Sequence, residues 1–288
     1  MTTGTPPDLS VLHADPAGAR PPSTPLPPGR LVVSSEENGN DRPLLWLSDG
    51  PPRFGLWDAL RAEHAETGLW PLLLEPLGDD DSFRPWGDGE LWPSDMSAPG
   101  DHDPAALLAG WWAAHTAPEE PDAEESNTGE QDTDQRPSTT APFGRAWPGL
   151  APAPPARTDP DRAAAEAADV LASVKDELRL GLVAAGRGAD ALTAVGWTGP
   201  ANYTGDTAEI SAVLRDWEDR FGARVVAVGF ATLYLSVGNP PSTPEHALRV
   251  AAEHFAFCPD NVWQGGVATL ADYAERLVDS EVWAFWWD

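Results

Sequence analysis

Cysteine is nearly absent from this sequence of 288 residues, because Cys258 is the only one. A single cysteine excludes an internal disulfide, and it excludes a zinc site built from several thiolates. Lysine is equally rare, since Lys175 is its only example and arginine supplies the other cations. The chain therefore folds without covalent cross-links, and its length allows a core of one or two domains.

Positive charge is scarce overall. The sequence has 18 Lys and Arg against 46 Asp and Glu, which gives a formal net charge of -28. A charge of this sign repels the phosphates of nucleic acids and the anionic surface of membranes. We therefore expect neither nucleic acid nor membrane as a partner.

Long hydrophobic runs are also missing. The longest, "VVAVGFATLYLSV", is too short to span a bilayer and is interrupted by glycine. The N-terminus, "MTTGTPPDLSVLHADPAG", has neither the basic nor the apolar region of a signal peptide. These absences indicate a cytoplasmic protein.

Tryptophan, in contrast, is abundant, with 14 residues. Most of them are expected in the core, but tryptophan is also the residue that interfaces and sugar-binding platforms use. The composition thus provides for a well-packed interior and leaves aromatic side chains available for binding.

The composition changes along the chain and divides it into four parts. Residues 1–29 are rich in proline and threonine and are interpreted as a disordered arm, followed by a smaller α/β unit at 30–116. Residues 117–158 form an acidic, proline-rich, disordered linker, and the C-terminal α+β domain covers 159–288. Within the linker, the apolar side chains of segment 143–150 predict that it docks onto a folded surface.

The hydrophobic periodicity predicts an α+β fold. In the first unit it indicates strands at 31–33, 44–47 and 69–77 and helices at 54–66 and 104–115. In the second it indicates strands at 178–185, 223–230, 232–237 and 281–287, with helices from 161, at 207–221, from 244 and at 269–279. From residue 178 onward this is the β-α-β-β-α-β order of split, ferredoxin-like sheets.

The last predicted strand, "EVWAFWW", is apolar on both sides. Strands of this kind are usually covered on both faces. We therefore expect the N-terminal α/β unit to pack against the C-terminal domain and to cover this strand.

Several motifs together resemble a bacterial domain-of-unknown-function family, domain of unknown function 4253. They are "LLWLSDG", "GRAWPGLAP", "GWTGPANY", "LRDWEDRFGARVVAVGFATLYLSVGNPP", "EHALRVAAEHFAFCPDNVWQG" and "WAFWWD". The resemblance covers nearly the full length apart from the arm and the linker. It supports the domain limits and implies no activity, cofactor or catalytic residue.

The one cysteine lies in "HFAFCPD", which places His254, Cys258 and Asp260 close together. Pro259 predicts that the preceding helix ends at the cysteine, where the partial negative charge of the helix terminus opposes a thiolate. Phe255 and Phe257 surround it with apolar bulk, which favours a small buried side chain.

Two functional alternatives for this cluster remain open. A nucleophilic thiol assisted by His254 and Asp260 would make the protein a hydrolase. The same three residues have the atom types and the spacing of metal ligands, although a fourth ligand is not evident. We expect neither a catalytic centre nor a bound metal or cofactor.

Four other residues are candidates for an interaction surface. Asp216 and Asp219 lie opposite the apolar stripe of the helix at 207–221, and Trp197 and Tyr203 lie in the loop "GWTGPANY". For the two aromatic residues core packing is the alternative, and for the two aspartates it is a face of local ion pairs.

Acidity, abundant tryptophan and the lack of an assembled catalytic motif favour an interaction protein. Its partner would be a basic protein, as for an immunity-like protein that neutralises a basic toxin. The alternative is a hydrolase or a metal-dependent enzyme that uses His254, Cys258 and Asp260. Exposure of Cys258 separates the two hypotheses, because a sealed thiol cannot attack a substrate.

Overall fold

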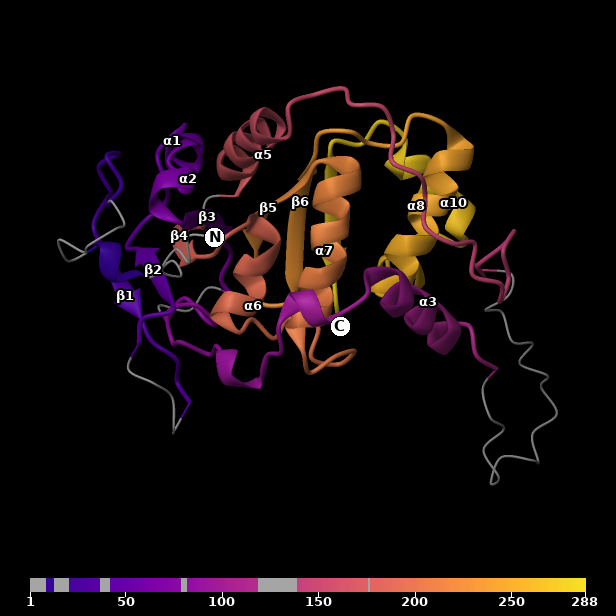
Figure 1. Cartoon of the computed structure of the whole chain (residues 1–288), viewed down its shortest axis with the longest axis horizontal. Helices are drawn as coiled ribbons and strands as arrows, with labels where there is room; N and C mark the ends of the chain where they lie inside the picture. The colour runs from indigo at the N-terminus through magenta and orange to yellow at the C-terminus, as the bar shows by residue number, and fades with distance from the viewer. Residues whose placement is uncertain (1–8, 13–20, 37–41, 79–81, 119–138, 176) are drawn as a thin grey trace, which may run out of the picture. The chain divides into compact units, whose positions relative to one another are not determined.

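The computed structural model describes residues 9–12, 21–36, 42–78, 82–118, 139–175 and 177–288 (Figure 1). It is an α+β structure with one seven-stranded sheet and several helices, which confirms the predicted class. Much of the predicted linker, most of the predicted arm and part of the acidic loop after residue 78 lie outside the described residues. No helix within the described ranges is long and apolar enough to cross a membrane.

The chain divides into two compact units whose limits differ from 30–116 and 159–288. Unit 1 comprises Met1–Asp103, Ala153–Pro240 and Glu281–Asp288. Unit 2 comprises Pro104–Pro152 and Pro241–Ser280. Each unit therefore combines residues from the first and the second half of the sequence.

The sheet belongs to unit 1. Its strands are β1 (Gly29–Val32), β2 (Leu45–Ser48), β3 (Leu69–Leu74), β4 (Arg179–Ala184), β5 (Ala223–Val228), β6 (Thr232–Val237) and β7 (Val282–Trp286). They lie in the order β1-β2-β4-β3-β5-β6-β7, and β3 with β5 is the parallel pair.

The order of elements from β4 onward is the predicted β-α-β-β-α-β, but the pairing is not that of a split sheet made from these four strands. β3 lies between β4 and β5, and β7 pairs with β6 at one end of the sheet. The sequence of β3, "LWPLLL", suits this place, because a strand that is apolar and buried along its whole length is favoured inside a sheet over an exposed edge. Gly181 of β4 allows this close approach, because a Cβ atom there would lie 2.6 Å from a methyl carbon of Leu74.

Helices cover both faces of the sheet in unit 1. They are α1 (Leu56–Ala62), α2 (His64–Thr67), α5 (Pro160–Val174), α6 (Ala191–Val195) and α7 (Thr207–Phe221), with short 3-10 turns η1 (Leu9–Leu12), η2 (Pro93–Asp95), η3 (Pro99–Asp101) and η4 (Gly188–Asp190). Trp217 of α7 packs on Phe285 of β7, whereas Lys175, at the end of α5, lies over the ring of Tyr234 on the opposite face of β6. The helix predicted at 207–221 is confirmed, and it ends where Gly222 adopts a positive φ of 62°.

β7 is covered on one face. Trp283 and Phe285 are buried beneath α7, as their apolar character requires. Val282 and Trp286 on the other face remain 39% and 41% exposed. Within the described residues, the expectation that both faces would be covered is therefore wrong for the second face, because these two side chains lie at the end of the sheet and stay partly exposed.

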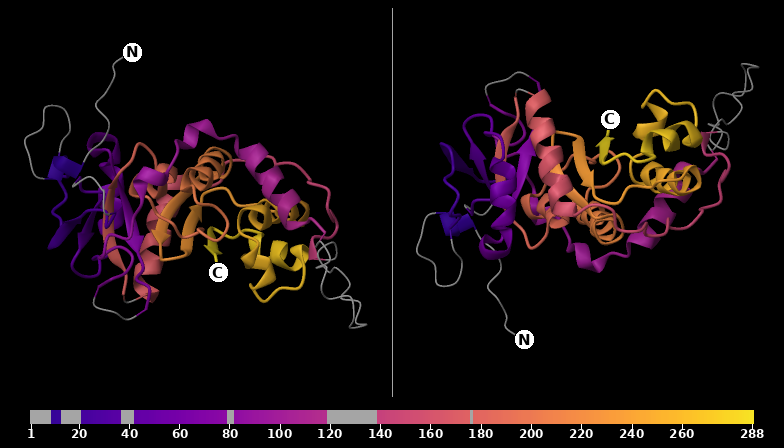
Figure 2. Two further views of the ribbon diagram at one scale, coloured as in Figure 1. Left: turned by 90° about the horizontal axis from the view of Figure 1, so that it is seen from below. Right: turned by 90° about the horizontal axis from the view of Figure 1, so that it is seen from above.

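Unit 2 is helical. It contains α3 (Pro104–His115), α8 (Pro244–Phe257), α9 (Asp260–Trp263) and α10 (Leu270–Leu277), and α8 packs against both α3 and α10 (Figure 2). Thr243 caps α8, with proline at the first helical position, as the sequence predicts. Thr269 and Asp272 form a reciprocal capping box at the start of α10.

Candidate functional site

Cys258 lies at the C-terminal end of α8, as its position before proline predicts. Its backbone N–H donates to the carbonyl oxygen of His254 at 2.8 Å, and its side chain is 0% exposed. The thiol sulfur lies 3.6 Å from Oδ1 of Asn261. The only thiol of the chain is thus sealed inside unit 2 and does not face a cleft.

His254 is buried beside the cysteine and is uncharged at neutral pH. Its Nδ1 lies 3.1 Å from the hydroxyl of Tyr273, which also accepts from Nδ2 of Asn261 at 2.9 Å. Burial lowers the pKa of His254 to about 3 and raises the pKa of Tyr273. His254 therefore offers no imidazolium to stabilise a thiolate.

Asp260 begins α9 and is buried as well. Its Oδ1 accepts from Nε2 of Gln264 at 3.2 Å. Within the described part of the chain, no group of three or more His, Cys, Asp or Glu side chains is placed to hold a metal ion. The three residues of the predicted cluster therefore lie near one another, but each is part of a buried hydrogen-bonded region.

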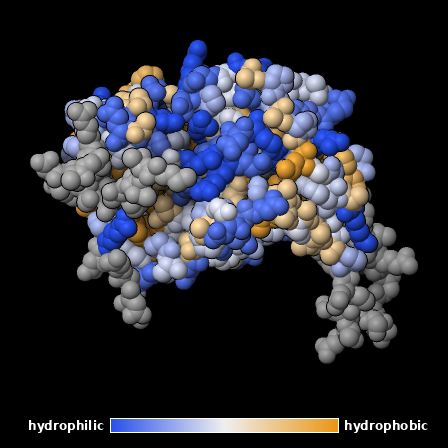
Figure 3. Space-filling model, in the orientation of Figure 1, coloured by the Kyte–Doolittle hydropathy of each residue, from blue (hydrophilic) through white to orange (hydrophobic). Residues whose placement is uncertain are grey.

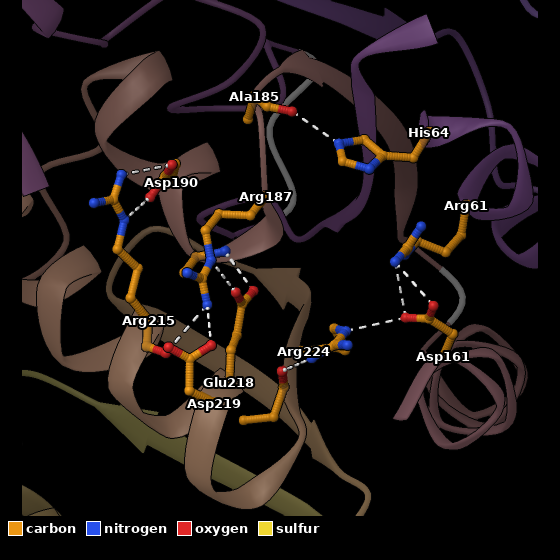
Figure 4. A network of polar contacts seen from close by, with 12 residues as sticks. Arg61, His64, Asp161, Ala185, Arg187, Asp190, Arg215, Glu218, Asp219 and Arg224 are labelled. Carbon is orange, nitrogen blue, oxygen red and sulfur yellow. Dashed lines mark hydrogen bonds and ion pairs between the residues drawn. The ribbon is translucent and has the colours of Figure 1, made fainter. Parts of the chain in front are cut away.

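The outward face of α7 is a network of ion pairs (Figure 4). Asp219, one of the predicted interaction residues, accepts from Nη2 of Arg187 at 2.8 Å. Glu218 also pairs with Arg187 and accepts from the backbone N–H of Ala189 at 2.8 Å. Asp216, the other predicted residue, accepts from Nε of Arg220 at 2.8 Å. Asp216 thus has the local pairing within one helix that the sequence offered as the alternative, whereas the partner of Asp219 lies 32 residues away in the chain.

Glu218 is the least exposed carboxylate of this network, with 7% of its side chain exposed. Burial raises its pKa, and the guanidinium of Arg187 opposes that rise. Sequence analysis missed this residue and its partner. The available signal was the "GRG" after a predicted strand, because it places one arginine in the loop that follows that strand.

Further ion pairs join other elements of unit 1 (Figure 4). Arg215 donates from Nη2 to Asp190 at 2.8 Å. Asp161 of α5 binds Arg61 of α1 at 2.9 Å and Arg224 of β5 at 3.0 Å. Such pairs fix helices to strands and to one another, which is a structural role.

The two aromatic candidates differ in exposure. Trp197 is 1% exposed, and its Nε1 donates to the carbonyl oxygen of Gly229 at 2.9 Å. Its ring lies 5.8 Å from that of Trp287. It is a core residue and is not available to a partner, whereas Tyr203 is 37% exposed and keeps part of its ring at the surface.

The aromatic residues around the predicted docking segment gather in unit 2. The ring of Trp112 lies 6.4 Å from Phe143 and 5.6 Å from Trp147. The ring of Phe255 in α8 also lies 5.6 Å from that of Trp112. Segment 143–150 thus lies against α3 and α8.

One hollow in unit 1 has the volume of a small-molecule site, about 640 Å³. Its lining is mostly aliphatic, with Ser34, Glu36, Arg42 and Ser94 as its polar members. Glu36 accepts from the hydroxyl of Ser94 at 2.6 Å.

A comparison with protein families matches one part of the chain. Residues 179–288 match the family model described as Domain of unknown function (DUF4253). Searches of curated proteins and of solved structures gave no match. The matched region begins at β4 and is shorter than the nearly full-length resemblance that the motifs suggested. The C-terminal part of this chain, residues 179–288, is thus similar to the DUF4253 family.

Proposed function

We propose that this protein is a cytoplasmic interaction module that binds a basic protein, in the manner of an immunity-like protein. The observation that supports the proposal is that arginine side chains of the protein are paired with its own carboxylates. Arg187, Arg215 and Arg220 are each paired with carboxylates of unit 1. Pairing of every cation with one carboxylate would still leave an excess of 28 negative charges.

This excess charge suits recognition of a cationic surface. Figure 3 shows hydrophilic residues over most of the visible face, with apolar residues in smaller groups. A negative field attracts a basic partner over several ångströms and raises the association rate, and it repels acidic competitors. Specificity would then come from shape and from the exposed aromatic side chains.

The alternative, a hydrolase or metal-dependent enzyme built on His254, Cys258 and Asp260, has less support. All three side chains are buried, and the pKa of His254 is lowered by that burial. We expect the native protein to react slowly with a thiol reagent and the urea-unfolded protein to react at once. Rapid labelling of the native thiol at neutral pH would favour the enzyme instead.

The test of the proposed function is affinity purification of the tagged full-length protein from its own cells, followed by kinetics with the purified captured protein. We expect a basic partner whose association rate falls steeply between about 50 mM and about 500 mM salt, because salt screens the attraction. An acidic control protein of similar size should not associate. Association with a neutral or acidic partner at a rate independent of salt would contradict the proposal.

A further inference from the structure

One face of α8 holds the extended segment 147–152 through its backbone. His246, Arg249 and Glu253 are spaced three and four residues apart, so they lie on the same side of the helix. Residues 147–152 belong to neither a helix nor a strand. The segment is therefore held by side chains of α8 in place of secondary-structure hydrogen bonds.

Each of the three side chains binds a different backbone group. Glu253 Oε1 accepts from the N–H of Ala151 at 2.6 Å. His246 Nε2 lies 2.8 Å from the carbonyl oxygen of Pro152, and Arg249 Nη1 donates to that of Pro148 at 3.3 Å. Together they recognise one donor and two acceptors within five residues.

Glu253 shows that this arrangement is a built site. Its side chain is 0% exposed, and a buried carboxylate is costly unless hydrogen-bond donors satisfy it. The N–H of Ala151 is one such donor, and Ala151 is itself buried.

Two further features restrict which residues the segment can carry. The ring of Trp147 packs on Trp112 of α3, with the centroids 5.6 Å apart. Gly149 has a φ of 80°, which favours glycine, and it turns the chain between the two carbonyl contacts. The surface thus favours a six-residue sequence that matches residues 147–152: an aromatic residue, Pro, Gly, any residue, Ala and Pro.

Aromatic-lined surfaces that bind the backbone of extended proline-rich segments are a common mode of peptide recognition. We propose that the surface formed by His246, Arg249, Glu253 and Trp112, named here the α8 groove, binds a proline-rich segment of this pattern from a partner protein. In the free protein, residues 147–152 occupy the groove. A partner exchanges with them when its concentration exceeds the effective concentration of the tethered segment, because both make the same contacts. This proposal does not depend on the charge of the partner.

The decisive experiment uses a fluorescent peptide with the sequence of residues 143–152 and the full-length variant Ala151→Pro. The proline removes the N–H that Glu253 binds and keeps an extended backbone, so it releases the resident segment selectively. We expect the peptide to bind this variant at least tenfold more tightly than it binds the unchanged protein. The variant Ala153→Pro, changed at an exposed position next to the segment, should behave as the unchanged protein.

A second peptide tests the chemistry of the groove. A peptide that carries the same Ala151→Pro change lacks the donor for Glu253 and should not bind. Equal binding of both peptides, or no binding to an Ala151→Pro protein whose circular dichroism is native, would overturn the proposal.

If the variant Ala151→Pro fails to fold, hydrogen exchange measured on the unchanged protein tests the same proposal. Excess peptide should displace the resident segment and speed the exchange of the Ala151 amide, while the amides inside α8 stay protected. If excess peptide does not change the hydrogen exchange of the Ala151 amide, the peptide does not displace the resident segment and the proposal is wrong. A dimer at high protein concentration that excess peptide dissociates would overturn the assignment to a different protein, because the segment would then come from a second copy of this chain.

Discussion

At the scale of single residues, His254 shows how burial decides chemistry. The sequence correctly brings histidine, cysteine and aspartate within one turn of a helix end, and those atom types suit a catalytic or metal site. It does not show that α8 is buried on nearly every side from Val250 to Cys258. That burial is a property of the packing of α3, α9 and α10 around it, so residue type alone could not exclude catalysis.

The buried histidine predicts a specific loss of stability in acid. The pKa of His254 is about 3 in the folded chain, against about 6.5 when unfolded, so the unfolded chain takes up the proton first as the pH falls. Its contribution is fully present above about pH 6.5 and is lost toward about pH 3, with a total on the order of 5 kcal/mol. Urea unfolding of His254→Asn should show a free energy of unfolding that declines less steeply with acid than that of the unchanged protein.

Tyr273→Phe is the matched control for this prediction. It removes the hydroxyl that Nδ1 of His254 contacts but leaves the imidazole to titrate. It should lower the stability by a similar amount at each pH and keep the original slope. If His254→Asn has the same slope as the unchanged protein, His254 is not the residue that takes up the proton.

At the scale of elements, periodicity predicts helices well and their partners poorly. The apolar stripe of α7 fixed its bounds at 207–221, and the cap and proline at Thr243 and Pro244 placed the start of α8. The partner of Glu218, in contrast, is Arg187, 31 residues earlier in the chain. The hydrophobic periodicity of a helix indicates which of its faces is polar. It does not indicate which cation, distant in the sequence, pairs with a carboxylate on that face.

The ion pairs of α7 should differ in strength according to their burial. Arg187→Ala leaves the nearly buried Glu218 without its guanidinium and should cost about 2–3 kcal/mol, because a buried carboxylate loses its compensation while Arg187 itself is partly exposed. Urea denaturation measures the loss. The double variant Arg187→Ala with Glu218→Gln should recover part of it, since no buried charge remains.

Arg162→Ala is the control for this prediction. Arg162 and Glu166 form an exposed pair within α5, and water screens such pairs almost completely. Its removal should leave the midpoint of urea unfolding unchanged. An equal effect of Arg162→Ala and Arg187→Ala would show that burial of Glu218 does not matter.

At the scale of the whole molecule, the sheet combines strands that lie far apart in the sequence. The sequence predicted the strands and the α+β class. It could not predict that β3 would pair with β4 on one side and β5 on the other, because strand pairing leaves no local pattern. The family match has the same limit: it begins at β4, yet both neighbours of β4, which are β2 and β3, lie before it.

Residues 156–288 expressed alone should therefore aggregate. Without β2 and β3, β4 has no neighbour and β5 loses one, so the apolar side chains of Leu180, Leu182 and Val226 meet water. Light scattering and thermal unfolding measure this, and co-expression with residues 30–116 should restore a soluble complex.

The full chain without residues 119–138 is the control, because it keeps every strand of the sheet. It should remain soluble. A monomeric fragment 156–288 that unfolds sharply at the same temperature as the full chain would show that β2 and β3 are dispensable.

The place of β3 in the sheet also sets an order of events during synthesis. Roughly 100 residues separate Leu74 from its partner Arg179, so at usual translation rates β3 waits roughly 5–20 s for the strand beside it. During that time a fully apolar run is exposed on the nascent chain. A ribosome paused before residue 179 would carry this run as a substrate for chaperones, and folding of the sheet would start only after β4 and β5 emerge.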